Sequence, residues 1–173
     1  LLYNKIEKCI DLDMLFEKMP WIENRLKDKS HDAALYVGIT STDFFTGLDY
    51  AESENNSYLI AKWENHSYGE TGGVGWTEWS ILYITNKNNP GSYKEIESMA
   101  VKTRDRRDPK KDQHHLQGYD RVKIVGASDE EVIVKLYNPN DESIYNGRKF
   151  NIKNKTTIGI TQKTMDEKYL KNE

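Results

Sequence analysis

A short basic tract contains the residue types in this chain that are best suited to binding chemistry. From Lys102 to His115, six cations accompany three acids, although the whole chain has 25 basic and 28 acidic residues. The rest of the chain therefore carries 19 basic and 25 acidic residues. A local positive segment on an acidic chain attracts phosphate or carboxylate groups. The tract ends in two histidines, the side chains that titrate nearest neutral pH.

This charge pattern favours a binding protein over an enzyme. We expect an intracellular protein that contacts a polyanionic partner, either nucleic acid or an acidic protein surface. Three aspartates and Pro109 interrupt the tract, so a solvated loop beside a helix end is the competing interpretation. The candidate binding residues are Arg104, Arg106, Arg107, Lys110, Lys111, His114 and His115.

Three other residues could support a small thiol hydrolase, which is the alternative function. Cys9 would supply the thiolate, His115 would hold the proton and Asn138 would orient the imidazole ring. The order Cys, His, Asn, with helices before strands, resembles papain-like and calpain-like cysteine peptidases, and this resemblance implies hydrolysis through Cys9. A buried and inert cysteine in a helix is the competing interpretation.

A nuclease is the other form of the hydrolase alternative. The run Ala34-Leu35-Tyr36-Val37-Gly38-Ile39-Thr40 resembles the second strand of the GIY-YIG nuclease family. Glu97 follows on a predicted helix, and the resemblance implies that it is the acidic residue of such a site. No Gly-Ile-Tyr strand precedes the run, and the helical arginine of that family has no counterpart near Gly47.

A third resemblance concerns nucleotide chemistry. Three short segments resemble the opening pattern of ADP-ribosyl-transferring folds: Leu35-Tyr36-Val37-Gly38, Gly47-Leu48-Asp49 and Leu82-Tyr83-Ile84-Thr85. That pattern has Arg or His where this chain has Val37, and those residues anchor the nicotinamide nucleotide. We therefore expect no cofactor.

The single cysteine limits both the compartment and the metal chemistry. With Cys9 alone, neither an intramolecular disulfide nor a cysteine-based zinc site can form, so we expect no metal and a cytoplasmic or other reducing compartment. No apolar run approaches the roughly 20 residues that span a bilayer, so we expect no membrane partner. The sequence leaves the oligomeric state open.

The elements that must position these residues divide the chain into a helical part and a strand-rich part. Apolar spacing predicts a helix over 3–19, ended by Pro20, and a second helix over 21–27. Interrupted helix is expected over 43–63 and a further helix over 93–104. Strands are expected over 33–39 and 76–85, with a glycine-rich loop over 66–75 and a turn over 86–91.

After Tyr119 the apolar period changes to two. A hairpin is expected from alternating residues on both sides of Ala127-Ser128-Asp129, and short strands over 150–152 and 158–160. We expect turns at Asn138 to Asp141 and at Asn146-Gly147, and a short helix from Lys163 to Leu170.

These elements predict an α+β fold with N-terminal helices packed on a mostly antiparallel sheet and a β-rich C-terminal third. We expect one domain over 1–173. It would be helical over 1–30, mixed over 31–115 and built of antiparallel strands over 119–161, with a short helix at the C-terminus.

Overall fold

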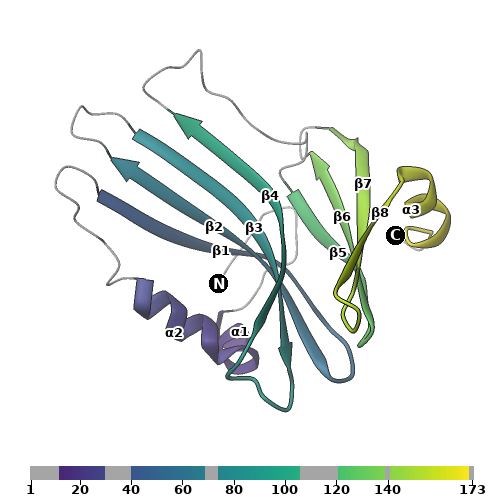
Figure 1. The fold of residues 1–173 in the computed structure, drawn as a ribbon, viewed down its shortest axis with the longest axis horizontal. Helices are drawn as coiled ribbons and strands as arrows, with labels where there is room; N and C mark the ends of the chain where they lie inside the picture. Colours follow the sequence, from purple (N-terminus) through teal and green to yellow (C-terminus); the bar gives the residue numbers. More distant parts are fainter. Residues whose placement is uncertain (1–11, 30–39, 69–73, 106–120, 139–140, 172–173) are drawn as a thin grey trace.

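The computed structural model describes residues 12–29, 40–68, 74–105, 121–138 and 141–171. Within these ranges the chain forms two antiparallel sheets of four strands each and three helices (Figure 1). The first sheet contains β1 (Thr40–Glu52), β2 (Asn56–Tyr68), β3 (Val74–Asn86) and β4 (Lys94–Asp105). The second contains β5 (Arg121–Ala127), β6 (Glu131–Asn138), β7 (Asp141–Asn151) and β8 (Thr156–Ile160). The helices are α1 (Leu12–Lys18), α2 (Pro20–Lys29) and α3 (Gln162–Lys168).

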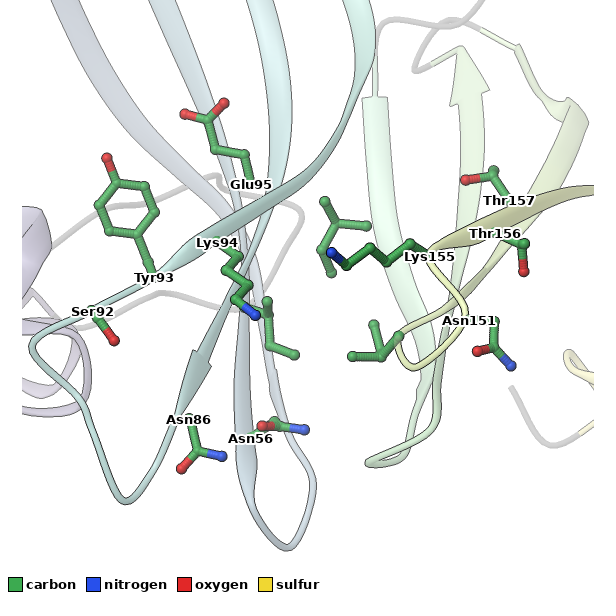
Figure 2. A pocket seen from close by; sticks show the side chains of 13 residues that line it. Asn56, Asn86, Ser92, Tyr93, Lys94, Glu95, Asn151, Lys155, Thr156 and Thr157 are labelled. Atoms are coloured by element: carbon green, nitrogen blue, oxygen red, sulfur yellow. The ribbon is translucent and has the colours of Figure 1, made fainter.

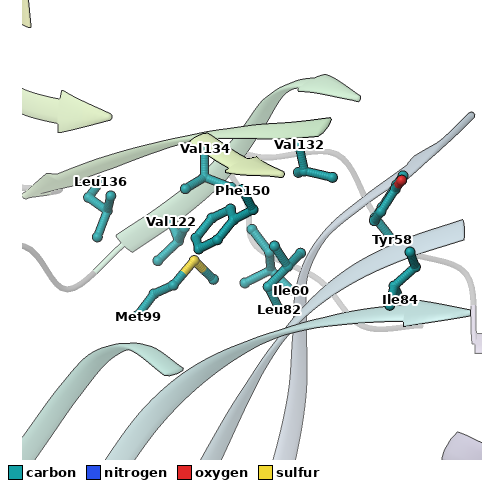
Figure 3. Close-up of a cluster of buried hydrophobic side chains, with 10 residues drawn as sticks. All are labelled: Tyr58, Ile60, Leu82, Ile84, Met99, Val122, Val132, Val134, Leu136 and Phe150. Carbon is teal, nitrogen blue, oxygen red and sulfur yellow. The ribbon is translucent and has the colours of Figure 1, made fainter. Parts of the chain in front are cut away.

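The two sheets pack face to face around one apolar core (Figure 3). In each sheet the strands follow one another in sequence order, from β1 to β4 and from β5 to β8. The core side chains come from both sheets in equal number: Tyr58, Ile60, Leu82, Ile84, Met99, Val122, Val132, Val134, Leu136 and Phe150. Because side chains alternate along a strand, the core residues of β2, of β3 and of β6 lie two positions apart.

The outer face of the first sheet is also apolar, and α1 and α2 cover it (Figure 1). Leu15 of α1, Trp21 and Ile22 of α2, and Met19 between the two helices pack against residues of β2 and β3. The Trp21 indole Nε1 donates to the Thr85 hydroxyl at 2.8 Å, and both side chains are buried. The middle of β2 and of β3 is therefore covered on both faces.

The outer face of the second sheet is covered in part by α3. The Thr161 hydroxyl accepts a hydrogen bond from the Thr164 N–H and caps the start of this helix. Met165 packs above Gly147 of β7, where an added Cβ would lie inside contact distance of the Met165 sulfur. Glycine at this position therefore permits the close approach of α3 to the sheet.

The α+β prediction is wrong, because the described residues are mostly β-strand. Residues 43–63 form most of β1 and β2, and residues 93–104 form β4, where helices were expected. In β2 the apolar residues are consecutive because both faces are buried, which hides the period of two. In β4 the pairing with β3 skips Ile96 and Met99, one extra residue at each position. These two bulges place apolar residues three apart on one face, and that spacing imitates a helix.

Several smaller predictions are confirmed. Pro20 separates α1 from α2, β3 contains the predicted strand over 76–85, and β5 pairs with β6 as a hairpin. The predicted C-terminal helix is α3. The predicted turn at Asn146-Gly147 is wrong, since both residues lie inside β7.

Other predictions lie outside the residues that the structure describes or remain untested. The strand expected over 33–39 and most of the glycine-rich loop belong to the first group, although Gly75 lies in β3. The single-domain organisation stays a prediction. Among the described helices, none is both long enough and apolar enough to cross a bilayer.

Candidate functional site

The predicted basic tract is described only at its beginning. Arg104 lies near the end of β4, paired in register with Trp76 of β3, so this part of the tract is strand and does not extend a helix. The other predicted binding residues lie outside the described ranges: Arg106, Arg107, Lys110, Lys111, His114 and His115.

The residues of the hydrolase alternative are not brought together in the described part of the chain. Cys9 and His115 lie outside it, and Asn138 is the last residue of β6, opposite Asp141. Glu97 lies on β4, where its carboxylate accepts hydrogen bonds from Arg148 Nη1 and from the Thr157 hydroxyl, both at 3.1 Å. Glu97 therefore ties β4 to the second sheet. No cluster of three or more metal-ligating side chains occurs among the described residues.

A groove of about 590 Å³ opens between the two sheets, where the start of β4 faces the turn between β7 and β8 (Figure 2). Its volume is within the range of about 300–1,000 Å³ that is usual for ligand pockets. The lining residues come from the start of β2, the end of β3, the start of β4 with the two residues before it, and the β7–β8 turn with the start of β8: Asn56, Ile84, Asn86, Ser92, Tyr93, Lys94, Glu95, Ile96, Asn151, Ile152, Lys155, Thr156 and Thr157.

The apolar part of the groove is the exposed margin of the inter-sheet core. Ile84 belongs to the core, and Ile96 and Ile152 pack against it while also lining the groove. Tyr93 is 38% exposed and stacks on Trp21 with ring centroids 4.0 Å apart, so its ring lies on the helix-covered side of the first sheet and points away from the second sheet (Figure 2). A ligand in the groove would therefore find apolar surface from the three isoleucines.

Two lysines line the groove from opposite sides. Lys94 is the first residue of β4, and Lys155 lies in the β7–β8 turn with its side chain extending across the gap toward β4 (Figure 2). Among the described residues neither ammonium group has a carboxylate partner, whereas Lys18, Lys87 and Lys149 do. Glu95 also lines the groove, so the lining has two positive charges and one negative charge.

The backbone holds Lys155 in an unusual conformation. Its φ is 53°, the left-handed region that costs a residue with a Cβ roughly 1–2 kcal/mol. This conformation closes the turn between β7 and β8 and places the Lys155 side chain at the groove. A glycine would fit the same turn without that cost, but it would provide no cation.

One asparagine adds a fixed hydrogen-bond donor. The Asn86 Oδ1 accepts the Asn88 N–H at 2.8 Å, so its Nδ2 group remains as the donor end of the side chain. The Asn151 Oδ1 accepts the Asn154 N–H at 2.8 Å, but this side chain points away from β4 (Figure 2). The groove therefore has the Asn86 amide and the two ammonium groups as donors.

The perturbed carboxylates lie elsewhere, around the turns that join β1 to β2 and β5 to β6. The pKa of Asp129 is lowered because its carboxylate accepts hydrogen bonds from the Ser53 hydroxyl and from the backbone and side chain of Asn55. The pKa of Glu52 is lowered chiefly by the Tyr50 hydroxyl, which donates to it at 2.7 Å. Burial raises the pKa of the Tyr50 hydroxyl. These groups hold turns together.

The groove could not be predicted from the sequence, because its residues come from three separate stretches of the chain. Lys94 and Lys155 are 61 positions apart and stand among other scattered charges. Only the turn composition at Asn151 to Lys155 was a visible signal, and it predicts a turn and no more.

Comparison of the chain with protein-family models, with curated proteins and with solved structures found no match.

Proposed function

We propose that this chain is a non-catalytic binding protein that contacts an anionic partner in the groove between β4 and the β7–β8 turn. The observation that supports this most strongly is the pair of groove lysines, Lys94 and Lys155, which have no carboxylate partner among the described residues. An unpaired ammonium group gains from a ligand carboxylate or phosphate, because charge-assisted hydrogen bonds are stronger than neutral ones. The donor end of Asn86 adds to the same preference.

The groove also selects for a ligand with an apolar body. Ile84, Ile96 and Ile152 form apolar lining, and a hydrophobic group that covers them leaves water at about 25 cal/mol per Å² of buried surface. A free inorganic anion would use the cations alone. We expect tighter binding of a carboxylate that carries a short hydrocarbon chain.

A matched ligand series tests this function. Hexanoate, hexanol and hexylamine share one hydrocarbon chain and differ in charge, and NMR titration of backbone amides locates their binding. We expect hexanoate to shift the amide signals of Lys94, Asn151 and Thr156 most strongly, followed by hexanol, with hexylamine weakest. Equal affinity for the three ligands would contradict the proposal.

Variants of the same turn provide the control. Lys155→Gly removes the ammonium group and the left-handed strain together, whereas Lys153→Ala removes an exposed lysine of the same turn that does not line the groove. Lys94→Ala combined with Lys155→Gly should weaken hexanoate binding at least tenfold, and Lys153→Ala should leave it unchanged. A similar loss in both variants would point to general charge attraction instead.

The basic tract extends the proposal to a polyanionic partner. Lys94 and Arg104 lie on the same strand, ten residues apart, which is about 33 Å in extended backbone. A partner that contacts both must be a macromolecule. Charge reversal of Arg104, Arg106, Arg107, Lys110 and Lys111 should lower affinity for nucleic acid and flatten its salt dependence in filter binding. Unchanged affinity and slope would remove the tract from the proposal.

A further inference from the structure

The four sheet edges of this chain differ in how they are protected against pairing with another strand. The registers of β1, β4 and β5 skip one or two residues each, which marks bulges at Leu48, at Ile96 and Met99, and at Val125. Bulges and charged side chains are the usual devices that prevent an edge strand from accepting a new partner. The fourth edge, β8, pairs with β7 without a register shift.

The edge strand β8 is short, but it also lacks charged residues and proline, two further devices that protect an edge. Its sequence, Thr-Thr-Ile-Gly-Ile, contains neither a charge nor a proline, and Ile158 is 56% exposed. In the part of the chain that the structure describes, β8 pairs with β7 alone. Every second residue of an edge strand directs its N–H and C=O outward, so β8 offers unpaired backbone groups over five residues.

The contact between Glu97 and β8 leaves this edge accessible. Thr157 is paired in register with Phe150, whose side chain is in the inter-sheet core, so the Thr157 side chain points to the inner face. Glu97 binds the Thr157 hydroxyl from that face. A new strand would add in the plane of the sheet, and side chains stand roughly perpendicular to that plane.

The open edge and the donor-rich groove are continuous. Thr156 and Thr157 belong to β8 and line the groove, and Lys155 directly precedes them. An extended chain paired with β8 would therefore place its inward side chains next to Ile96, Ile152 and the groove lysines. Main-chain hydrogen bonds would supply affinity, and the groove would select the side chains.

We propose that the partner of this groove is an extended peptide segment of another protein that adds to β8 as a fifth strand and places a carboxylate between Lys94 and Lys155. This inference rests on the proposed anion-binding function of the groove. The carboxylate belongs to an aspartate, a glutamate or the C-terminus of the segment. Its alternating residues are β-branched or aromatic, because such side chains suit both the strand and the apolar lining.

Charge distinguishes this partner from a second copy of the chain. The strand β8 of a second copy could pair with this edge, but it contains no carboxylate. Pairing of two β8 strands would therefore not itself bring a carboxylate to the groove lysines. The donor-rich lining therefore favours an acidic segment from a different protein.

Selection from a pool of random twelve-residue peptides against the complete chain tests the inference. We expect the enriched peptides to combine an acidic residue with alternating β-branched or aromatic residues. Replacing the acid by its amide should weaken binding at least tenfold, and so should N-methylation of the backbone at alternate positions. Lys155→Gly should cause a comparable loss, whereas Lys153→Ala should bind as the original chain does.

Other outcomes would overturn the inference. Enriched peptides that tolerate N-methylation on both sets of alternate positions would show that no strand is added. Peptides that bind Lys155→Gly and the original chain equally would place the site elsewhere, and an empty selection would reject a peptide partner. A dimer in sedimentation velocity that Ile158→Lys dissociates would assign the edge to a second copy. If hexanoate still binds through Lys155 in any of these cases, only the peptide inference fails.

Discussion

The two long margins of the sandwich are each formed by one edge strand from either sheet, but their polar side chains are used differently. At the margin where β1 meets β5, the Asp49 carboxylate accepts the Ile124 N–H at 2.6 Å, and the Tyr58 hydroxyl donates to the Ser128 carbonyl at 2.6 Å. At the margin where β4 meets β8, Glu97 bonds to Arg148 and Thr157 of the second sheet, and beside it lies a groove whose two lysines have no carboxylate partner among the described residues. Side chains bonded to the backbone close the first margin, whereas the groove lysines make the second available to a ligand.

The largest effect is expected from the core that supports both margins. Phe150 is 1% exposed and packs between the sheets (Figure 3). Phe150→Ala should lower the free energy of unfolding by about 3–5 kcal/mol, because it removes buried surface and leaves a cavity. Urea denaturation measures this change. A loss below about 1 kcal/mol would mean that the sheets do not share this core.

At the closed margin, we expect a moderate effect from Asp49. Asp49→Ala removes the acceptor of the partly buried Ile124 N–H and should cost about 1–3 kcal/mol. Urea denaturation measures the loss, and hexanoate titration should show unchanged affinity because the groove lies at the other margin. Weaker hexanoate binding in the folded variant would contradict the separation of the two margins.

At the open margin, Glu97 should matter less for stability. Glu97→Gln keeps the side-chain shape but removes the charge that pairs with Arg148 at 3.1 Å, and it should cost about 0.5–1.5 kcal/mol. The pair is partly exposed, so salt screens it, and the difference from the original chain should shrink in 1 M sodium chloride. A difference that persists at full size in high salt would indicate a packing role instead.

The smallest effect is a pH dependence that belongs to the closed margin. Hydrogen bonds from Ser53 and Asn55 lower the pKa of the Asp129 carboxyl in the folded chain. A lowered folded-state pKa adds stability above the unfolded pKa of about 3.9, and that stability is lost as the pH falls through the folded value. Asp129→Asn should therefore lose stability at pH 7 and show a weaker acid dependence than the original chain.

The neighbouring acid provides the control for this pH effect. The Glu130 carboxylate makes no hydrogen bond within the described part of the chain, although its backbone and that of Asp129 belong to the same turn. Glu130→Gln should leave the acid dependence of urea denaturation unchanged. Identical profiles for Asp129→Asn and the original chain would show that the Asp129 bonds do not contribute.

The elements with a clear local signal could be predicted from the sequence. The β5–β6 hairpin has alternating residues and a turn at Ala127-Ser128-Asp129, and Pro20 marks the break between α1 and α2. In both places the local pattern and the final environment agree, so periodicity alone was sufficient.

The first sheet could not be predicted in the same way, because its pattern depends on what covers it. Tyr58 and Ile60 face the second sheet, while Leu59 and Ala61 face α1 and α2. Consecutive apolar residues then carry no period, and the bulges in β4 introduce a false helical one. The groove depends on this sheet and on the β7–β8 turn together, so its lysines could not be grouped beforehand.

The position of a bound anion tests the central claim most directly. A crystal structure of the complete chain with 6-bromohexanoate would locate the carboxylate by its density and the bromine by its anomalous signal. The account predicts the carboxylate between Lys94 and Lys155, with the bromine against Ile84, Ile96 or Ile152. Bromine signal away from the groove, at a ligand concentration that saturates binding in solution, would contradict it.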